Sequence, residues 1–292
     1  MLCHHACPEG TWESVFSLPD RRLWPGVRCY RGFRFALPQP RRRLEVPNGS
    51  VTLMLGFGSR LDLHGATETG SYHSLLAGLR TGPVIGEHDG RLHGVEIILS
   101  PWAAFALFGA ALADTPGNAA DPTDILGPRV RRLTERLAET PTWPERFARL
   151  DATLLRWSAS GRPHAPQVAW AWEELRRTGG TAPLDALAAR SGWSKRQFHH
   201  HFVQQIGTTP KTAARIHRLG RVLRLLATDL SYARTAEACG FFDQSHLNRE
   251  FTAMTGLTPG RFRADRTSGA GAPGEQDRLR GEVTSVLLPH PA

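Results

Sequence analysis

The feature that most constrains the fold is a helical pattern that occurs twice, at residues 182–207 and 231–256. Each copy consists of a short apolar helix, a turn that contains a glycine, and a second helix that begins at a polar residue. Gly192 and Gly240 allow the left-handed backbone that a tight turn needs. The pattern therefore predicts two helix-turn-helix units in one chain.

Capping residues and apolar spacing define the second helix of each unit. Ser194 and Asp243 are placed to cap these helices, because their side-chain oxygens can accept a backbone N–H. Apolar residues recur at the spacing of one buried helix face. We expect this face to contain Phe198 and Phe202 in the first unit, and Phe242, Leu247 and Phe251 in the second.

A single long helix is predicted over residues 209–228, between the two units. Its buried stripe is expected to contain Ile216, Leu219, Val222, Leu223 and Leu226. Gly220 in the middle costs about 1 kcal/mol relative to Ala, and close packing would explain it.

An outward stripe on the last of these helices is rich in hydrogen-bonding side chains. Positions i, i+1, i+4 and i+5 lie on one side of a helix, and here they are Gln244, Ser245, Asn248 and Arg249. Arginine can pair with guanine O6 and N7, and glutamine or asparagine with adenine N6 and N7, in the major groove. The corresponding stripe of the first unit is Arg196, His199 and His200. Both stripes are predicted to read bases; phosphate contact or plain solvation is the alternative for any single residue.

Positive charge is concentrated in the same region. Residues 182–266 contain 13 Arg and Lys against 6 Asp and Glu, a net of +7, whereas the whole chain carries +9. A concentrated basic segment is typical of a polyanion-binding domain, and a solvated charged face is the alternative. We expect phosphate contacts or helix-surface charge at Lys195, Lys211 and Arg218.

Two helix-turn-helix units joined by a rigid helix resemble the DNA-binding domain of the AraC/XylS family of bacterial transcription regulators. The resemblance covers residues 165–265 and is strongest in "ACGFFDQSHLNREFTAMTGLTPGRFR", residues 238–263. It implies a sequence-specific regulator that reads two adjacent major-groove segments with the two stripes. It also implies an N-terminal domain that binds a small effector or mediates dimerisation. One departure is His201, which stands where the family usually has an apolar residue.

The sequence pattern of the N-terminal half predicts strands followed by helices. Short runs separated by glycine, proline and asparagine predict strands at 27–35, 50–58, 60–65, 71–80 and 92–100. Helical periodicity follows at 102–113, 124–140, 143–159 and 167–180. The expected class is α+β, with a β-rich sandwich or cupin-like N-terminal domain that includes helices and an all-α C-terminal domain. Residues 1–20 show no periodicity and are expected to be irregular.

These observations divide the chain into four segments. We expect a β-rich sensor or dimerisation domain at 1–115, connecting helices and a linker at 116–164, and the DNA-binding domain at 165–266. Residues 267–292 are rich in glycine, serine and charge and are expected to form a disordered tail.

The sequence contains no recognisable set of catalytic residues, so we expect that the chain is not an enzyme and binds no cofactor. Consecutive histidines at 199–201 point about 100° apart on a helix and cannot all bind one metal ion. Cys3, Cys7, Cys29 and Cys239 do not form a disulfide framework. Two rival functions are a DNA-repair alkyl-transfer protein, which needs a reactive cysteine at Cys29 or the Cys3/Cys7 pair, and a non-specific architectural DNA binder.

Double-stranded DNA is the expected partner. RNA polymerase, a small-molecule effector and a second copy of the chain are further candidates. A membrane is not, because no apolar run reaches the ~18–20 residues of a spanning helix. Without a legible secretory signal, the expected location is the cytoplasm, at the nucleoid. The target sequence, the effector and the choice between activation and repression are not predicted.

Overall fold

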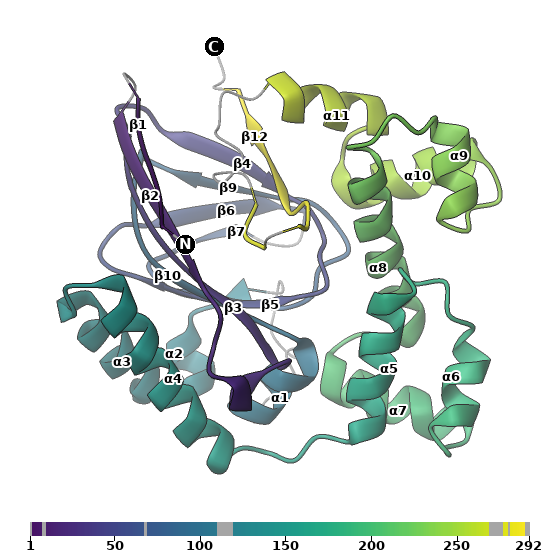
Figure 1. The fold of residues 1–292 in the computed structure, drawn as a ribbon, viewed down its shortest axis with the longest axis horizontal. Helices are drawn as coiled ribbons and strands as arrows, with labels where there is room; N and C mark the ends of the chain where they lie inside the picture. Colours follow the sequence, from purple (N-terminus) through teal and green to yellow (C-terminus); the bar gives the residue numbers. More distant parts are fainter. Residues whose placement is uncertain are drawn as a thin grey trace.

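The computed structural model describes residues 2–7, 10–66, 69–109, 119–268, 277–279 and 281–289. Two antiparallel sheets form the N-terminal half, and helices form the rest (Figure 1). The α+β class predicted from the sequence is therefore confirmed.

Twelve strands make up the two sheets among the residues described. The seven-stranded sheet has the order β1 (Leu2–Cys7), β2 (Gly10–Ser17), β3 (Val27–Ala36), β10 (Arg91–Leu99), β5 (Val51–Gly56), β8 (Leu75–Ala77) and β11 (Ala119–Ala120). The five-stranded sheet has the order β12 (Ser285–Leu288), β4 (Arg41–Glu45), β9 (Val84–His88), β6 (Leu61–Gly65) and β7 (Thr69–Tyr72).

Apolar side chains fill the space between the two sheets. Phe33, Phe35 and Met54 of the first sheet share one buried cluster with Leu63 and Val84 of the second. All six residues of β5 are buried, as expected of a central strand covered on both faces. The N-terminal half is therefore a sandwich of two sheets.

A 3₁₀ turn and four helices cover the outer face of the seven-stranded sheet. They are the 3₁₀ turn η1 (Arg21–Leu23) and helices α1 (Pro101–Phe108), α2 (Pro122–Leu126), α3 (Pro128–Glu139) and α4 (Trp143–Ala159). Tyr30 and Leu53 of the sheet share a cluster with Leu133 and Phe147 of α3 and α4. The helix predicted over 124–140 is broken in two at Gly127, and the last part of the predicted helix 102–113 lies outside the described residues.

Seven helices form the C-terminal half of the part described. They are α5 (Pro166–Arg177), α6 (Leu184–Arg190), α7 (Lys195–Ile206), α8 (Pro210–Leu225), α9 (Tyr232–Ala238), α10 (Gln244–Thr255) and α11 (Pro259–Ser268). All five residues predicted for the stripe of the long helix are buried. Gly220 does not owe its place to close packing, because a Cβ there would meet only Arg224 Nη1, at 3.8 Å.

Two expectations for the ends of the chain were wrong, and the sequence pattern also missed β4, β9 and β11; the one strand predicted at 71–80 is divided between β7 and β8. Residues 1–20 contain β1 and β2, and the tail expected to be disordered contains β12, which pairs with β4. β4 itself was not predicted, because Arg41, Arg43 and Glu45 face the space between the sheets and leave no apolar alternation to detect. The partner of β12 lies far away in the sequence, so no local signal marks it.

The buried apolar residues of the C-terminal half belong to two clusters. One lies under α5, α6 and α7. The other joins Leu219, Leu247 and Phe262 of the second unit to Leu44 at the end of β4 and Val286 of β12. The second helix-turn-helix unit therefore shares its core with the five-stranded sheet. No helix within the described residues has the length and apolar character to cross a membrane.

Candidate nucleic-acid interface

The first helix-turn-helix unit consists of α6, a turn and α7. Gly192 in the turn has φ +74°, a left-handed conformation that side chains disfavour. Ser194 caps α7 through a reciprocal pair of hydrogen bonds: its Oγ accepts from the Gln197 N–H at 3.3 Å, and its own N–H donates to Gln197 Oε1 at 3.0 Å. Phe198 and Phe202 are buried beneath the helix, as predicted.

The second unit repeats this arrangement with α9 and α10. Gly240 has φ +71°, and Asp243 caps α10 by accepting the His246 N–H at 2.6 Å. Leu247 and Phe251 are buried, as predicted. These two units confirm the pattern read from the sequence.

Phe242 was expected to face the core and does not, because its side chain is 93% exposed. The residue precedes the cap of α10, where the backbone is not yet helical. Helical spacing therefore does not apply to it, and its side chain lies in solvent beside the start of the helix.

The predicted base-reading residues lie on accessible parts of α7 and α10. Arg196, His199, His200, Gln244, Ser245 and Arg249 are exposed, whereas Asn248 is half-buried. The Asn248 Oδ1 is enclosed without a hydrogen-bond partner among the described residues. Neither Arg196 nor Arg249 makes an ion pair with any residue that the structure describes, so both guanidinium groups are available to an outside acceptor. Base contact itself remains a prediction.

The three candidates for phosphate contact differ in their surroundings. Lys211 is exposed in the first turn of α8. Lys195 pairs with Asp185 at 2.7 Å, and both side chains are largely in water, where such a pair is worth about 0–1 kcal/mol and can be exchanged for a phosphate. Arg218 is half-buried, with its guanidinium over the Phe241 ring at 5.4 Å. Its geometry favours a role in holding α8 against the second unit.

The long helix α8 packs against the second helix of each unit. Arg215 of α8 donates two hydrogen bonds to Glu250 of α10, at 2.8 and 3.2 Å. The end of α5 approaches α8 at Gly180, where φ is +76° and a Cβ would meet the Ala214 carbonyl oxygen. The ion pair holds α10 against α8, and the buried cluster that joins Phe202 of α7 to Ala213 of α8 holds α7 against the same helix.

The run of three histidines has no shared ligand geometry. His199 and His200 are exposed, and His201 is half-buried with its ring 4.6 Å from that of Trp193. This aromatic contact covers one side of the His201 imidazole. Within the described part of the chain, no three His, Cys, Asp or Glu residues gather closely enough to hold a metal ion.

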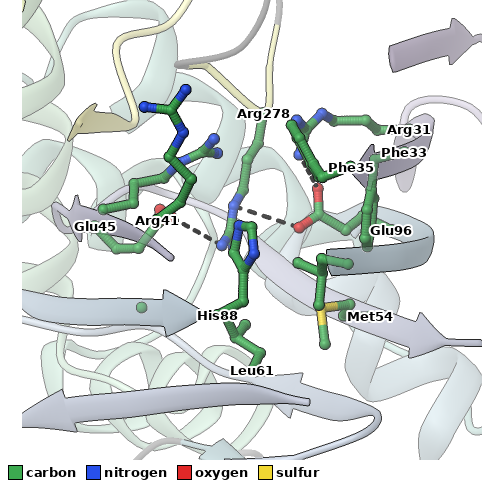
Figure 2. A pocket seen from close by; sticks show the side chains of 13 residues that line it. Arg31, Phe33, Phe35, Arg41, Glu45, Met54, Leu61, His88, Glu96 and Arg278 are labelled. Carbon is green, nitrogen blue, oxygen red and sulfur yellow. Dashed lines mark hydrogen bonds and ion pairs between the residues drawn. The ribbon is translucent and has the colours of Figure 1, made fainter. Parts of the chain in front are cut away.

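A polar cavity lies between the two sheets of the N-terminal half. Its volume is about 30 Å³, room for about two water molecules. Phe33, Phe35 and Met54 supply apolar wall, and the charged wall is formed by Arg31, Arg41, Arg43, Glu45, Glu96 and Arg278, with His88 among them (Figure 2). Burial first, and then Arg43, lowers the pKa of His88 to about 4, so this imidazole is neutral at neutral pH.

The described cysteines do not resemble reactive nucleophiles. Cys29 and Cys239 are buried free thiols. Burial raises the pKa of Cys29 to about 12 and also raises that of Cys239, whereas a nucleophilic cysteine needs a depressed pKa. The side chains of Cys3 and Cys7 lie outside the described residues. The alkyl-transfer alternative therefore receives no support from Cys29.

Comparisons with known proteins match the helical half. Residues 187–265 match the family described as a helix-turn-helix domain. The transcriptional activator NphR of Rhodococcus sp is 40% identical over 83 residues, which are 28% of this chain and 24% of NphR. The chain thus spans about a quarter of the length of that relative.

Solved structures resemble the chain over different extents. An AraC-type regulator from Chromobacterium violaceum is 28% identical, with a TM-score of 0.34, over 36% of this chain and 96% of that chain. The DNA-binding domain of AdpA, solved with a target DNA, is 30% identical, with a TM-score of 0.31, over 36% and 95%. ToxT from Vibrio cholerae is 8% identical, with a TM-score of 0.44, over 82% and 98%.

Proposed function

Because residues 187–265 form a helix-turn-helix domain of the AraC/XylS type, we propose that the chain is a regulator of transcription that reads two successive major-groove segments of one DNA site. The observation that carries this proposal is the pair of capped helices α7 and α10, held by one rigid helix: α7 has an exposed stripe of arginine and histidines, and α10 has a stripe of amide, hydroxyl and arginine side chains. Reading segments one helical turn apart would place the two helices about 34 Å apart along the duplex. The resulting site is long and asymmetric.

Within this proposal, α10 reads bases through Gln244, Ser245, Asn248 and Arg249, and α7 reads them through Arg196, His199 and His200. Lys195 and Lys211 supply phosphate contact or surface charge, whereas the half-buried Arg218, also a candidate from the sequence, packs over Phe241 and holds α8 against the second unit. The net charge of +7 over residues 182–266 supports a large phosphate-dependent share of the binding free energy. Affinity should therefore fall steeply as salt is added.

A decisive experiment selects genomic fragments with the purified chain and footprints the bound sites. We expect a discrete protected region of two segments about one helical turn apart. Arg249→Ala should weaken binding by about 1–3 kcal/mol and relax preference at one base position. Lys211→Ala should weaken binding to all sequences alike and lower the salt slope by about one.

Arg177→Ala is the matched control, because Arg177 is an exposed arginine on α5 that pairs with Glu174 at 2.8 Å. It removes the same charge without touching either stripe. If Arg249→Ala and Arg177→Ala bound every sequence equally well, the base-reading assignment would be wrong. A ratio of selected to random DNA affinity near one would instead indicate the architectural binder.

The N-terminal sandwich is proposed to carry the control of this activity in the cytoplasm. Its polar cavity (Figure 2), which has room for only about two water molecules, is the candidate site for a small effector that displaces part of the chain when it binds. Contacts to a second copy of the chain and to RNA polymerase complete the proposed partners. Regulation in either direction, activation or repression, fits this arrangement.

A further inference from the structure

The cavity of the sandwich is filled from inside the chain, by Arg278 of the C-terminal segment (277–279 and 281–289) (Figure 2). Arg278 Nη2 donates to Glu45 Oε1 at 2.8 Å, and Arg278 Nε lies 3.4 Å from Glu96 Oε1. Arg31 Nη1 donates to the other oxygen of Glu96 at 3.1 Å. One guanidinium therefore spans two carboxylates that come from two different sheets.

The two carboxylates form a built site, because they are almost completely enclosed. The exposed fractions of the Glu45 and Glu96 side chains are 2% and 3%, and that of Arg278 is 14%. Burial alone would raise the pKa of Glu96, but Arg278 and Arg31 hold it below its ordinary value. Charged carboxylates in such a place need a cationic partner. Without Arg278, Glu45 would have no ion-pair partner among the described residues.

A second observation indicates unused binding capacity at the same place. Glu45 Oε2 is enclosed and accepts no hydrogen bond from any group that the structure describes. A carboxylate oxygen can accept two hydrogen bonds, so this atom could receive a further N–H. The cavity beside it has aromatic walls at Phe33 and Phe35, which suit the flat face of a delocalised cation.

The same segment is attached to the second helix-turn-helix unit. Arg266 of α11 donates to both carboxylate oxygens of Asp277, at 3.0 and 2.9 Å, and to the Ser285 carbonyl oxygen at 2.7 Å. Val286 of β12 is completely buried in the cluster that contains Leu247 of α10. Figure 1 shows β12 between β4 and α11. The chain segment that contains Arg278 therefore connects the cavity to the buried core beneath α10.

We propose that Glu45 and Glu96 form a binding site for a guanidinium or amidinium cation, that Arg278 is its intramolecular occupant, and that a small molecule carrying such a group competes with Arg278 and releases the C-terminal segment. A planar fork of N–H donors matches two carboxylates better than a point charge does. A tethered occupant acts at an effective concentration of about millimolar, so free competitors are needed at that level or must add contacts to the aromatic wall. The regulatory part of this proposal rests on the proposed function, whereas the cation site does not.

Chemical rescue tests the site. Arg278→Ala leaves two buried carboxylates with one cation fewer, so its Tm should fall by several degrees. Methylguanidinium chloride, added at millimolar concentration, should raise the Tm of this variant. It should not raise the Tm of the double variant Arg278→Ala/Glu45→Gln. Sodium chloride at the same ionic strength should give no rescue in either protein.

Two further measurements keep the test decisive if Arg278→Ala fails to fold. Arg278→Lys retains the charge but not the fork, and methylguanidinium should raise its Tm more than it raises that of Arg42→Ala. Arg42 lies on β4, the strand of Glu45, and pairs with Glu87 at 3.2 Å on a partly exposed surface, so this control loses an ion pair outside the cavity. In the unaltered chain, methylguanidinium should speed hydrogen exchange at residues 285–288 and leave exchange in α5 unchanged.

Absence of rescue by methylguanidinium, or equal rescue by sodium chloride, would overturn the cation site. The coupling is tested on a selected DNA site, where Arg278→Ala should bind several-fold more weakly than the unaltered chain because Val286 supports the core under α10. Equal affinity would overturn the coupling. Failure of every protein, including the unaltered chain, to select any DNA would refute the proposed function and leave the thermal result intact.

Discussion

His217 of α8 should make the stability of the folded chain depend on pH below neutrality. Its side chain lies where the sandwich meets the helical half: a Cβ on Gly49 would come 2.7 Å from His217 Cε1, and the ring packs edge-on against Trp172 at 4.6 Å. Only 8% of the residue is exposed, and Nε2 has no hydrogen-bond partner among the described residues. A proton added here would be buried and unshared.

The arginines around His217 oppose protonation further. Arg28 of β3, Arg176 of α5, Arg224 of α8 and Glu282 of the C-terminal segment line the pocket beside it. Burial first, and then Arg176, Arg28 and Arg224, lower the pKa of His217 from 6.5 to about 3. The folded chain therefore keeps this imidazole neutral at pH 5.

The sign and size of the effect follow from proton linkage. Below pH 6.5, His217 binds a proton in the unfolded chain but stays neutral in the folded chain. The free energy of unfolding therefore falls with falling pH until about pH 3. Between pH 7 and pH 5 the loss through His217 is about 2 kcal/mol. A folded pKa one unit higher would give nearly the same figure, because pH 5 would still lie above it.

Urea unfolding followed by far-UV circular dichroism at pH 7 and pH 5 measures this loss. Other buried histidines contribute equally to the unaltered chain and to His217→Leu, so the difference between the two proteins isolates His217. The variant should lose about 2 kcal/mol less stability over this range. His64→Leu, at an exposed position, is the control and should keep the original slope. If His217→Leu showed the same pH dependence as the unaltered chain, the argument from burial would be wrong.

Four substitutions test the geometry of the helical half by urea denaturation. Leu247→Ala should cost about 2–5 kcal/mol, because Leu247 is completely buried, whereas Phe242→Ser should change stability by less than about 0.5 kcal/mol; comparable losses at the two positions would contradict the placement of Phe242. Ser194→Ala should cost about 0.5–2 kcal/mol through loss of the cap of α7, and an unchanged unfolding midpoint would show that the cap contributes nothing. Gly180→Ala should cost at least about 1–3 kcal/mol from its left-handed backbone alone, and a stabilised variant would contradict that conformation.

The helical half was predictable because its signals are local. A cap acts within three residues of its helix, and the buried stripe of α8 repeats within a single helix. The error at Phe242 has the same origin, since the spacing rule holds only after the cap at Asp243. The positions of the two reading stripes follow from these helices, and their base contacts stay predictions.

The sandwich was only partly predictable, because its decisive contacts are not local. Runs rich in apolar residues marked β3, β5 and β10. The charged strand β4 becomes intelligible only when Arg278 is seen between Glu45 and Glu96. No pattern near Arg278 distinguishes it from the other arginines of a glycine-rich segment, so the sequence could not reveal its role.

Because β4 pairs with β12, the five-stranded sheet can be completed only late in the synthesis of the chain. Glu45 finds its partner Ser285 about 240 positions later in the chain, which at about 5–20 residues per second takes roughly 12–48 s to emerge. Throughout that interval this edge of β4 stays open to intermolecular pairing, as open strand edges do. A chaperone that covers this edge would therefore protect the nascent chain from aggregation until β12 has been synthesised. In a chain truncated before residue 285, the edge of β4 would stay exposed.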